Sequence, residues 1–484
     1  MGSQSNNPLA ASGRAEAVAA GYYGNMTPPE SRAGSVATSS IRRQILLLAA
    51  PALAQQGLLL TIQLYDQYLA GQFSQHHQAA LTTANYLYWF TTSYAVVVNA
   101  GATALVGRFV GSQDWTLANR TTAQALVLAA AFGLFGTAVA FAGMPGLIRL
   151  LGLQGDSADI ALDYLYPLAG LLPFYMLEVG GIACLVGAGD TRTGLKALAT
   201  VAAVNVPLAW GLSRGAWGLP NLGFLGIAWG TGLAHVFGSA LVLTTLVRGR
   251  YGLRLRLGNL APDGQLVARL LRVSIPAAAD SLSVGVFQFV FLGFVNRIGE
   301  TAASAHGIAL RLEGLGYLSG AAFATATAGI VGRALGERRP DLAARAGWTA
   351  FSMGALLMTG MGALFFMFAE PMFELFSQGP DRLPVIATGV PVLRLIAFAM
   401  PGLAGSVILT QALRGAGDTR VPVLITWAGF VGVRLPLAFL LTDPRGGYEW
   451  GLIGAWTAMF ADIYVRGAFF VARFAGGRWK RINV

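Results

Sequence analysis

The hexapeptide Gly-Ala-Gly-Asp-Thr-Arg at Gly187–Arg192 returns unchanged at Gly415–Arg420, 228 residues later in a chain of 484 residues. At an offset of 225 the tripeptide Val106–Arg108 also falls on Val331–Arg333. Matches of this kind continue over about 200 residues per copy, and so long a period is typical of a duplicated domain, not of a solenoid. We therefore expect two copies of one folding unit.

The composition indicates that this unit lies in a membrane. Hydrophobic residues make up 55% of the chain and charged residues 11%, against about 25% charged residues in soluble proteins. About twenty apolar residues are needed to span a hydrocarbon core of ~30 Å at 1.5 Å per residue. The sequence predicts an all-α integral membrane protein with about 12 transmembrane helices, near residues 44–70, 81–107, 121–142, 160–186, 195–213, 222–247, 270–296, 302–331, 346–369, 386–412, 421–441 and 450–472.

The distribution of basic residues predicts the orientation, because short loops rich in Lys and Arg stay in the cytoplasm. If both termini are cytoplasmic, the basic residues that fall on the opposite face are Arg149, Arg214, Arg297, Arg382 and Arg445. Six spans per copy return each copy to the same side. We therefore expect two parallel six-helix repeats, an N-lobe and a C-lobe, related by an axis along the membrane normal.

We place the boundaries from composition. The sequence predicts a disordered cytoplasmic tail at 1–40, the N-lobe at 41–247, a cytoplasmic linker at 248–265, the C-lobe at 266–474 and a basic cytoplasmic tail at 475–484. The net charge of +11 is explained by this topology and by attraction to anionic lipids. We expect a plasma (inner) membrane protein whose partners include membrane lipids and no nucleic acid.

The sequence resembles the MATE family, multidrug and toxic compound extrusion, from Arg42 to Arg473. The resemblance rests on Pro51, on Asp66–Gly71 (Asp-Gln-Tyr-Leu-Ala-Gly), which is similar to the family's Asp-x-x-Met-Ala-Gly, on Ala305–Glu313 and on Leu413–Arg420. It implies a secondary active exporter of organic cations or other amphipathic drugs, driven by antiport of H⁺ or Na⁺ through alternating access. We expect a monomer without a cofactor. Motifs of a membrane-embedded enzyme, such as His-Glu-x-x-His, are missing from the sequence, so we expect no enzymatic activity.

Acidic residues inside the spans are the first candidates for the coupling site, because an Asp at the bilayer centre costs about 2.5–3.5 kcal/mol on insertion scales. We compared four of these acidic residues with the equivalent positions of the other repeat, and none of them falls on another acid. The offsets place Asp66 on Phe291, Glu178 on Ser406, Asp280 on Gln55 and Glu313 on Tyr88. The acids are therefore asymmetric on a symmetric scaffold, and we expect different roles for the two lobes.

Asp66 is the strongest candidate for cation coupling. It lies in the outer half of the first helix beside Tyr65 and Tyr68, and no basic residue shares the core of that helix. Such a carboxylate can take up and release a proton, or coordinate Na⁺ with neighbouring oxygens. In the family an Asp at this position is a coupling residue. The alternative is a hydrated Asp near the end of a helix.

Asp280 and Asn205 are further coupling candidates, and each departs from the family pattern. Asp280 lies one turn after Pro276, whereas the family often places the acid of its seventh helix two turns after this proline, where Val284 stands here. Asn205 matches an Asn in the fifth helix of many members, but the carboxylate that some carry four residues later is replaced by Ala209. Asp280 is therefore either a coupling residue or a structural hydrogen-bonding group.

Glu313 has two possible roles. It shares the eighth helix with Arg311, and Arg394 and Arg434 lie in the tenth and eleventh helices. A buried ion pair with one of these arginines is one interpretation. The other is a carboxylate that faces the cleft and attracts cationic drugs or a proton.

Asp462 precedes Arg466 by four residues, the spacing of neighbours on a helix, and we interpret this pair as structural. Glu178 has no evident partner in its own helix and stays a coupling candidate. His235 and His306 are isolated in the sequence, so we expect packing roles for them. The doublet His76-His77 lacks further Cys or His at ligand spacing, which makes a metal site there improbable.

A polyspecific substrate site should be apolar and aromatic, with a few polar groups. Each candidate could equally be a packing residue. The candidates are Tyr86, Trp89, Asn99, Phe287, Gln288 and Tyr317.

Two further interpretations concern phosphate. The Gly-Ala-Gly-Asp-Thr-Arg repeats lack the Gly-Lys-Ser/Thr of a P-loop, so we expect helix-breaking turns in which Gly ends one helix and Asp or Thr caps the next.

A flippase or exporter of lipid-linked glycan precursors is the alternative function. It would need a cationic cleft, for which Arg311, Arg394 and Arg434 are the candidates.

Overall fold

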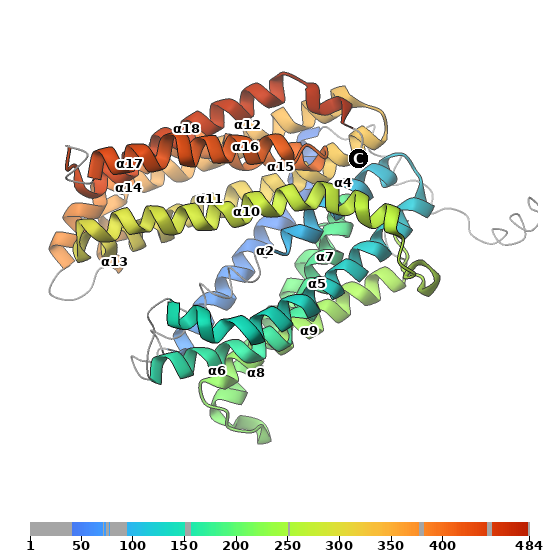
Figure 1. Ribbon diagram of the computed structural model, residues 1–484, viewed down its shortest axis with the longest axis horizontal. Coiled ribbons are helices and arrows are strands. Elements are labelled where there is room, and N and C mark those ends of the chain that lie inside the picture. The colour runs from blue at the N-terminus through green and yellow to red at the C-terminus, as the bar shows by residue number, and fades with distance from the viewer. Residues whose placement is uncertain are drawn as a thin grey trace, which may run out of the picture.

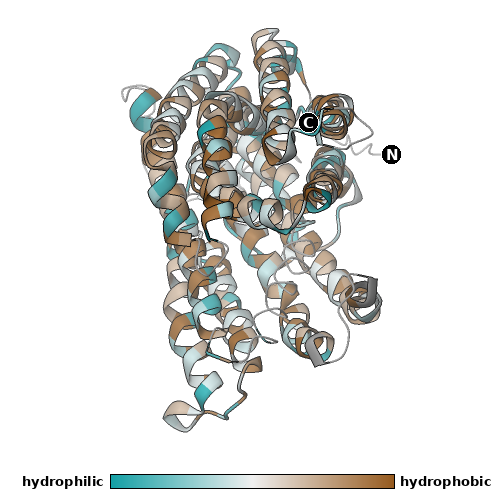
Figure 2. Ribbon diagram, turned by 90° about the vertical axis from the view of Figure 1, so that its left-hand side faces the viewer, coloured by the Kyte–Doolittle hydropathy of each residue, from teal (hydrophilic) through white to brown (hydrophobic). Residues whose placement is uncertain are grey.

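A computed structural model describes residues 41–70, 72–73, 77, 94–150, 156–249, 252–376, 382–442 and 448–482. Within these ranges every regular element is a helix. Nine of the described helices are long and apolar enough to cross a membrane, and one bent pair of helices qualifies if it is counted as a single span. Apolar residues recur along the whole length of these helices (Figure 2). The predicted all-α membrane architecture is confirmed.

The helices of the N-terminal half correspond to the first six predicted spans. The second span, predicted at 81–107, is described only from residue 94 onward. The fourth is bent by 51° between α6 and α7. The helices are α2 (Ile41–Ala70), α4 (Val96–Gly111), α5 (Trp115–Leu150), α6 (Asp156–Gly170), α7 (Leu172–Ala188), α8 (Arg192–Arg214) and α9 (Leu225–Val247).

The C-terminal half corresponds to the other six spans. Its tenth and eleventh spans are each interrupted by a π-helical segment, η5 (Gly405–Leu409) and η6 (Phe430–Arg434). Such segments often occur at functional sites. The helices are α10 (Gly264–Ile298), α11 (Glu300–Gly336), α12 (Pro340–Met367), α13 (Ala369–Phe376), α14 (Arg382–Ala404), α15 (Thr410–Gly415), α16 (Arg420–Gly429), α17 (Leu435–Thr442) and α18 (Gly451–Ala475).

The two halves form two groups of helices that meet at one end of the molecule and diverge toward the other (Figure 1). The main contacts between them involve α2, α4, α5 and α7 on one side and α10, α11, α12 and α15 on the other. The connection between the halves packs along the start of α5, where the Gln124 side-chain amide donates to the carbonyls of Asn259 and Ala261. The exact boundaries of the two lobes stay a prediction.

Helix α2 passes from one half to the other. Near its start, Ile45 and Ala49 belong to the hydrophobic core of the C-terminal half. At its end, Leu69 and Ala70 belong to a core of the N-terminal half. Pro51 lies close to this change of neighbours and removes one backbone hydrogen bond from the helix.

Helix α10 makes the reverse passage. Its residues Leu270 and Val273 pack in a core of the N-terminal half, whereas Phe291 and Val295 pack in that of the C-terminal half. Pro276 lies between these two sections. Because Pro276 falls on the proline of α2 at the repeat offset of 225, the two halves exchange equivalent helices at equivalent points.

The junction of the halves is a close crossing of α4 and α11. A Cβ atom added to Gly111 would overlap the carbonyl of Arg333, and one added to Gly336 would overlap the carbonyl of Arg108. These two contacts are related by the repeat offset of 225. Only glycine lets the two backbones approach this closely.

Each repeated hexapeptide forms the turn that the sequence predicts. Gly189 and Gly417 end the preceding helices with φ of +91° and +89°, a region that favours glycine. The Asp190 carboxylate accepts hydrogen bonds from the backbone N–H groups of Arg192 and Thr193, both at 3.0 Å, and so caps α8.

The end of the described chain returns to the junction. Trp479 is fully buried and stacks on Phe474 with ring centroids 4.6 Å apart. The Arg108 guanidinium donates to the carbonyl of Ile482 at 2.6 Å. The basic tail predicted at 475–484 therefore contacts both halves through its described residues.

The crossing predicts sensitivity to small side chains. We expect Gly111→Ala or Gly336→Ala to destabilise the protein by about 1–3 kcal/mol, because the added methyl group forces the two helices apart. Thermal unfolding of the purified protein, followed by loss of the monodisperse size-exclusion peak, measures the effect. Gly360→Ala is the control, because a Cβ atom there meets no atom within 4 Å. Equal unfolding midpoints for all three variants would contradict a tight junction.

Candidate functional site

Asp66 lies in a polar cluster made by three helices of the N-terminal half. The residue is buried, with 7% of its surface exposed. The Thr231 hydroxyl of α9 donates to Asp66 Oδ2 at 2.9 Å, and the Asn205 amide of α8 donates to Thr231 Oγ1 at 2.9 Å. The structure thus brings the two candidates Asp66 and Asn205 together through Thr231, which was not among the candidates.

Two oxygens of this cluster lack partners. Within the described part of the chain, Asp66 Oδ1 and Asn205 Oδ1 are buried and accept no hydrogen bond. Asp66 takes part in none of the ion pairs in the described part of the chain. A buried acceptor without a partner costs about 1–3 kcal/mol. The cluster can therefore gain free energy by taking up a proton or an oxygen-seeking cation.

Glu178 forms a second polar contact in the same half. Its Oε2 lies 2.8 Å from Nδ1 of His235, and both side chains are buried. His235, for which the sequence predicts a packing role, is buried as expected, but it is also paired with an acid. The partners are 57 residues apart on α7 and α9, so no local spacing in the sequence connects them.

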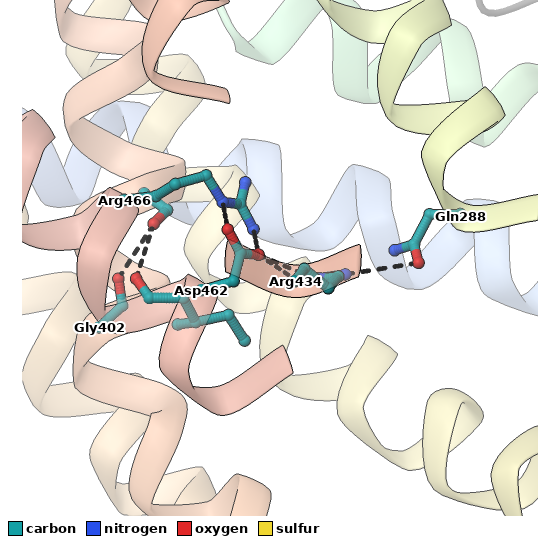
Figure 3. Close-up of polar contacts among 7 residues, drawn as sticks. Gln288, Gly402, Arg434, Asp462 and Arg466 are labelled. Atoms are coloured by element: carbon teal, nitrogen blue, oxygen red, sulfur yellow. Dashed lines mark hydrogen bonds and ion pairs between the residues drawn. The ribbon is translucent and has the colours of Figure 1, made fainter. Parts of the chain in front are cut away.

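The largest charged cluster lies in the C-terminal half (Figure 3). Arg434 Nη2 is 2.7 Å from Asp462 Oδ2, and Arg466 Nε is 2.7 Å from Asp462 Oδ1. Both guanidinium groups lie over the ring of Phe430, at 4.3 Å and 4.7 Å from its centroid. The predicted Asp462–Arg466 pair is confirmed, and Arg434 joins it from η6.

Asp280 is held by an arginine. Arg414 of α15 donates from Nη2 to Asp280 Oδ2 at 2.5 Å, and both side chains are nearly buried. Arg414 lies directly before the repeated hexapeptide Gly415–Arg420 and outside the span predicted at 386–412, which is why the sequence did not predict this pair. The ion pair gives Asp280 a structural partner.

Glu313 and Tyr317 face a more open environment along the first half of α11. Tyr317 is 49% exposed and Glu313 is partly buried. Among the described residues we find no hydrogen bond or ion pair to the Glu313 carboxylate, and the cations that act on it electrostatically are Arg434 and Arg466. Arg434 forms its ion pair with Asp462, and the ion pair considered between Glu313 and Arg434 is not formed.

The other two arginines considered in this context do not join the cluster. Arg311 and Arg394 are exposed. Arg394 lies over the ring of Phe366 on α12, 5.8 Å from its centroid. A cationic site made from Arg311, Arg394 and Arg434 together is therefore not assembled.

The substrate candidates are divided between several places. Tyr86 and Trp89 lie outside the described residues. Phe287 stacks on Phe430 with centroids 5.1 Å apart, and Gln288 accepts from Arg434 Nη1 at 3.5 Å. Both therefore border the arginine cluster and not Asp66.

Asn99 lies on α4, and its Oδ1 is buried without a partner in the described chain. The described residues contain no group of three or more His, Cys, Asp or Glu side chains that could hold a metal ion.

The N- and C-terminal clusters occupy equivalent positions in the two repeats. At the offset of 229 that aligns Pro207 with Pro436, Asn205 falls on Arg434. At the offset of 227 that aligns Trp229 with Trp456, His235 falls on Asp462. Phe291 is the residue of the C-terminal repeat that corresponds to Asp66 at the offset of 225. Its ring centroid lies 5.6 Å from the guanidinium carbon of Arg434. The repeat offsets were thus the signal in the sequence that could have found both clusters.

The Asp280–Arg414 pair predicts a double-mutant pattern. We expect Asp280→Ala or Arg414→Met alone to destabilise the protein by about 3–5 kcal/mol, because each leaves a buried charge without its partner. The double variant should regain most of this loss. Denaturation of the purified protein measures the three values, and additive losses would contradict a buried pair.

Comparisons of the sequence with known proteins agree with this architecture. The MatE family model matches residues 51–210 and 276–440, which together are more than half of the chain. A probable multidrug resistance protein NorM from Thermotoga maritima is 27% identical over 91% of this chain and 94% of its own. A protein of the same name from Pseudomonas aeruginosa is 27% identical over 87% of this chain and 86% of its own.

Solved structures share the fold. A MOP superfamily transporter from Pyrococcus furiosus, described as having a binding pocket of reverse polarity, matches with a TM-score of 0.85 at 19% identity. An outward-facing multidrug resistance MATE family transporter matches with a TM-score of 0.84 at 19% identity. Each match covers 93% of this chain and 99% of the other. The two matched segments of the family model, which follow the two repeats, show that this chain is a member of the MATE family of integral membrane transporters.

Proposed function

We propose that the protein is a secondary active multidrug exporter, which exchanges organic cations or other amphipathic compounds for H⁺ or Na⁺ by alternating access. The observation that carries the proposal is the buried Asp66 carboxylate, which has one oxygen bonded to Thr231 and the other without a partner in the described chain. The multidrug resistance names of the Thermotoga and Pseudomonas relatives support it.

The Asp66 cluster has the chemistry of a site for the coupling ion. A proton on Asp66 Oδ1 neutralises the buried charge. Alternatively, Asp66 Oδ1, Asn205 Oδ1 and Thr231 Oγ1 are three oxygens that suit a hard cation such as Na⁺. Either ion supplies the missing partner, so binding is favoured by the cluster as it stands.

Helix α2 provides the connection between ion binding and conformational change. Asp66 lies in the section that packs on the N-terminal half, whereas Ile45 and Ala49 pack on the C-terminal half, with Pro51 between. We propose that anionic Asp66 favours the outward-open form and that its neutralisation reshapes α2 and expels the drug. A change of about 1.4 kcal/mol in the balance between the two forms is enough for a tenfold shift in population.

We assign the attraction of cationic drugs to Glu313 and Tyr317. Tyr317 is 49% exposed, Glu313 is partly buried, and Glu313 has no ion-pair partner in the described chain. In the same half, the partly buried Phe287 adds an aromatic ring, which stacks on the buried Phe430.

The lipid-linked glycan alternative receives less support. It would need a cationic cleft, but Arg434 is neutralised in part by Asp462, and Arg394 stacks on Phe366. With Glu313, the C-terminal cluster holds two formal positive and two formal negative charges.

We further propose that the protein lies in the plasma (inner) membrane as a monomer, with both termini in the cytoplasm. This orientation puts the α4–α11 junction, with Arg108 and Arg333, on the inner side, in agreement with the positive-inside rule. The diverging ends of the helices then face outward, as in the outward-facing MATE structure that shares the fold.

The role of Asp66 is tested with Asp66→Asn. We expect ethidium efflux from proteoliposomes to fall at least tenfold, because the amide cannot carry the coupling charge. Imposing a proton gradient or a sodium gradient separately shows which ion drives efflux by the unchanged protein. Asp163→Asn, at an exposed carboxylate of α6, is the matched control and should keep full activity. If cationic dyes are not exported under either gradient, the multidrug proposal is contradicted and export of lipid-linked glycans becomes the favoured function.

The role of Glu313 is tested with Glu313→Gln. We expect the KM for cationic dyes to rise up to about tenfold, which corresponds to about 1.4 kcal/mol, and the KM for a neutral substrate to stay unchanged. Initial rates of efflux in proteoliposomes measure both. An equal rise for cationic and neutral substrates would contradict an electrostatic role and indicate a change in packing.

A further inference from the structure

The two halves hold their buried acids in different ways. In the C-terminal half, Asp280 is paired with Arg414, and Asp462 is shared by Arg434 and Arg466. An arginine keeps its charge at any pH that the protein meets. In the N-terminal half the partner of Glu178 is His235, and a histidine is the side chain whose charge changes near neutral pH.

The contact between Glu178 and His235 is close and enclosed. The Glu178 Oε2 to His235 Nδ1 distance is 2.8 Å, and the side chains are 1% and 9% exposed. The Tyr175 ring meets the imidazole edge-on with centroids 5.1 Å apart. Gly238 closes the site, because a Cβ atom there would lie 2.7 Å from Glu178 Oε2. The second carboxylate oxygen, Oε1, has no partner in the described part of the chain.

The pair is connected to Asp66 through α9. Thr231, which donates to Asp66, precedes His235 by four residues, so both side chains lie on one face of the helix. A charge on His235 acts electrostatically on Asp66. A proton on the imidazole and an ion at Asp66 are therefore not independent.

Few other charges face the pair. Helices α4 and α5 carry no charged residue between Val96 and Arg108 or between Arg120 and Arg149. Helix α8 faces the site with Val201 and Asn205, and its Lys196 is exposed. The remaining titratable residues of the packed helices include Asp159 and Asp163 of α6, which are exposed. The others are Arg42, Arg43, Tyr65, Asp66 and Tyr68 of α2, Asp156, Tyr164 and Tyr166 of α6, Tyr175 and Cys184 of α7, Arg192 and Arg214 of α8, and Glu300, His306, Arg311, Glu313, Tyr317 and Arg333 of α11.

The repeat shows that this arrangement is particular to one half. At the position of His235 the C-terminal half has Asp462, and at the position of Glu178 it has Ser406, whose hydroxyl donates to backbone carbonyls. The same place in the scaffold thus holds a cluster fixed by arginine in one copy and an acid–imidazole pair in the other.

We propose that Glu178 and His235 form a second proton-binding site of the N-terminal half, coupled to Asp66 through α9. The Nδ1–H group of His235 donates to Glu178 throughout, and the proton that binds and leaves is carried by Nε2. The role of this proton in transport rests on the proposed function as an ion-driven exporter, whereas the binding of the proton does not.

The binding is tested by NMR of histidine labelled with ¹³C and ¹⁵N in the full-length protein in nanodiscs. The chain has four histidines, so the signal that disappears in His235→Gln identifies His235. We expect this signal to respond to pH, because the imidazole is the group of the pair that gains and loses a proton. The midpoint of this response should be lower in Glu178→Gln, because that change removes the carboxylate beside the imidazole, and should be affected less in Asp66→Asn.

His306 is the internal control. It is buried, and its Nδ1 accepts a hydrogen bond from Trp456 Nε1 at 3.0 Å, so its ring stays neutral while this bond is kept. Its signal should not change with pH or with either variant, which also shows that the variants are folded. A His235 signal that is constant with pH, or a midpoint that is the same in Glu178→Gln, overturns the proposal.

The role in transport is measured as the number of protons exchanged per substrate in proteoliposomes. We expect this number to fall by one in the Glu178→Gln/His235→Gln variant, whereas Asp66→Asn stops transport. An unchanged number of protons overturns the coupling of this site. Continued transport by Asp66→Asn instead contradicts the proposed role of Asp66 and leaves the titration of His235 as a separate result.

Discussion

The close approach of two helix backbones at the α4–α11 junction is the contact on which the arrangement of the halves depends. Gly111 and Gly336 allow this approach, and each packs on the carbonyl of an arginine from the other repeat. Because the junction is at one end of the molecule, the remaining helices of the two halves are free to diverge (Figure 1). The exchange of α2 and α10 between the halves adds two long connections that cross this junction.

Duplication gave both halves the same scaffold, and the buried charges then differentiated them. Equivalent positions hold Asn205 and Arg434, and His235 and Asp462. A buried acid with an arginine partner remains ionised and fixed, so the C-terminal cluster is suited to stability and to binding. An acid with a hydroxyl, an amide or an imidazole partner can change its charge, and so the N-terminal half is suited to ion coupling.

Helix α2 is the element through which a local change in charge can reach both halves. It carries Asp66 in one section and contacts the core of the other half in its first section, with Pro51 near the change. A helix that belonged to one half alone would confine the effect of ion binding to that half. The partner of Asp66, Thr231, also places α9 in this connection and brings His235 within its reach.

The approximate number of spans, the duplication and the turns were predictable from the sequence, because these depend on local hydrophobicity and on short repeated motifs. The sequence also made Asp66 a coupling candidate and predicted the Asp462–Arg466 pair, since an acid within an apolar span and an i, i+4 spacing are visible in one dimension. Asn205 became a candidate only through the resemblance to the family. The partners of Glu178 and Asp280 and the second partner of Asp462 became visible only in three dimensions, because the imidazole of His235 and the guanidinium groups of Arg414 and Arg434 reach these acids from distant helices. These pairings depend on how helices cross in three dimensions, and hydropathy and periodicity do not specify those crossings.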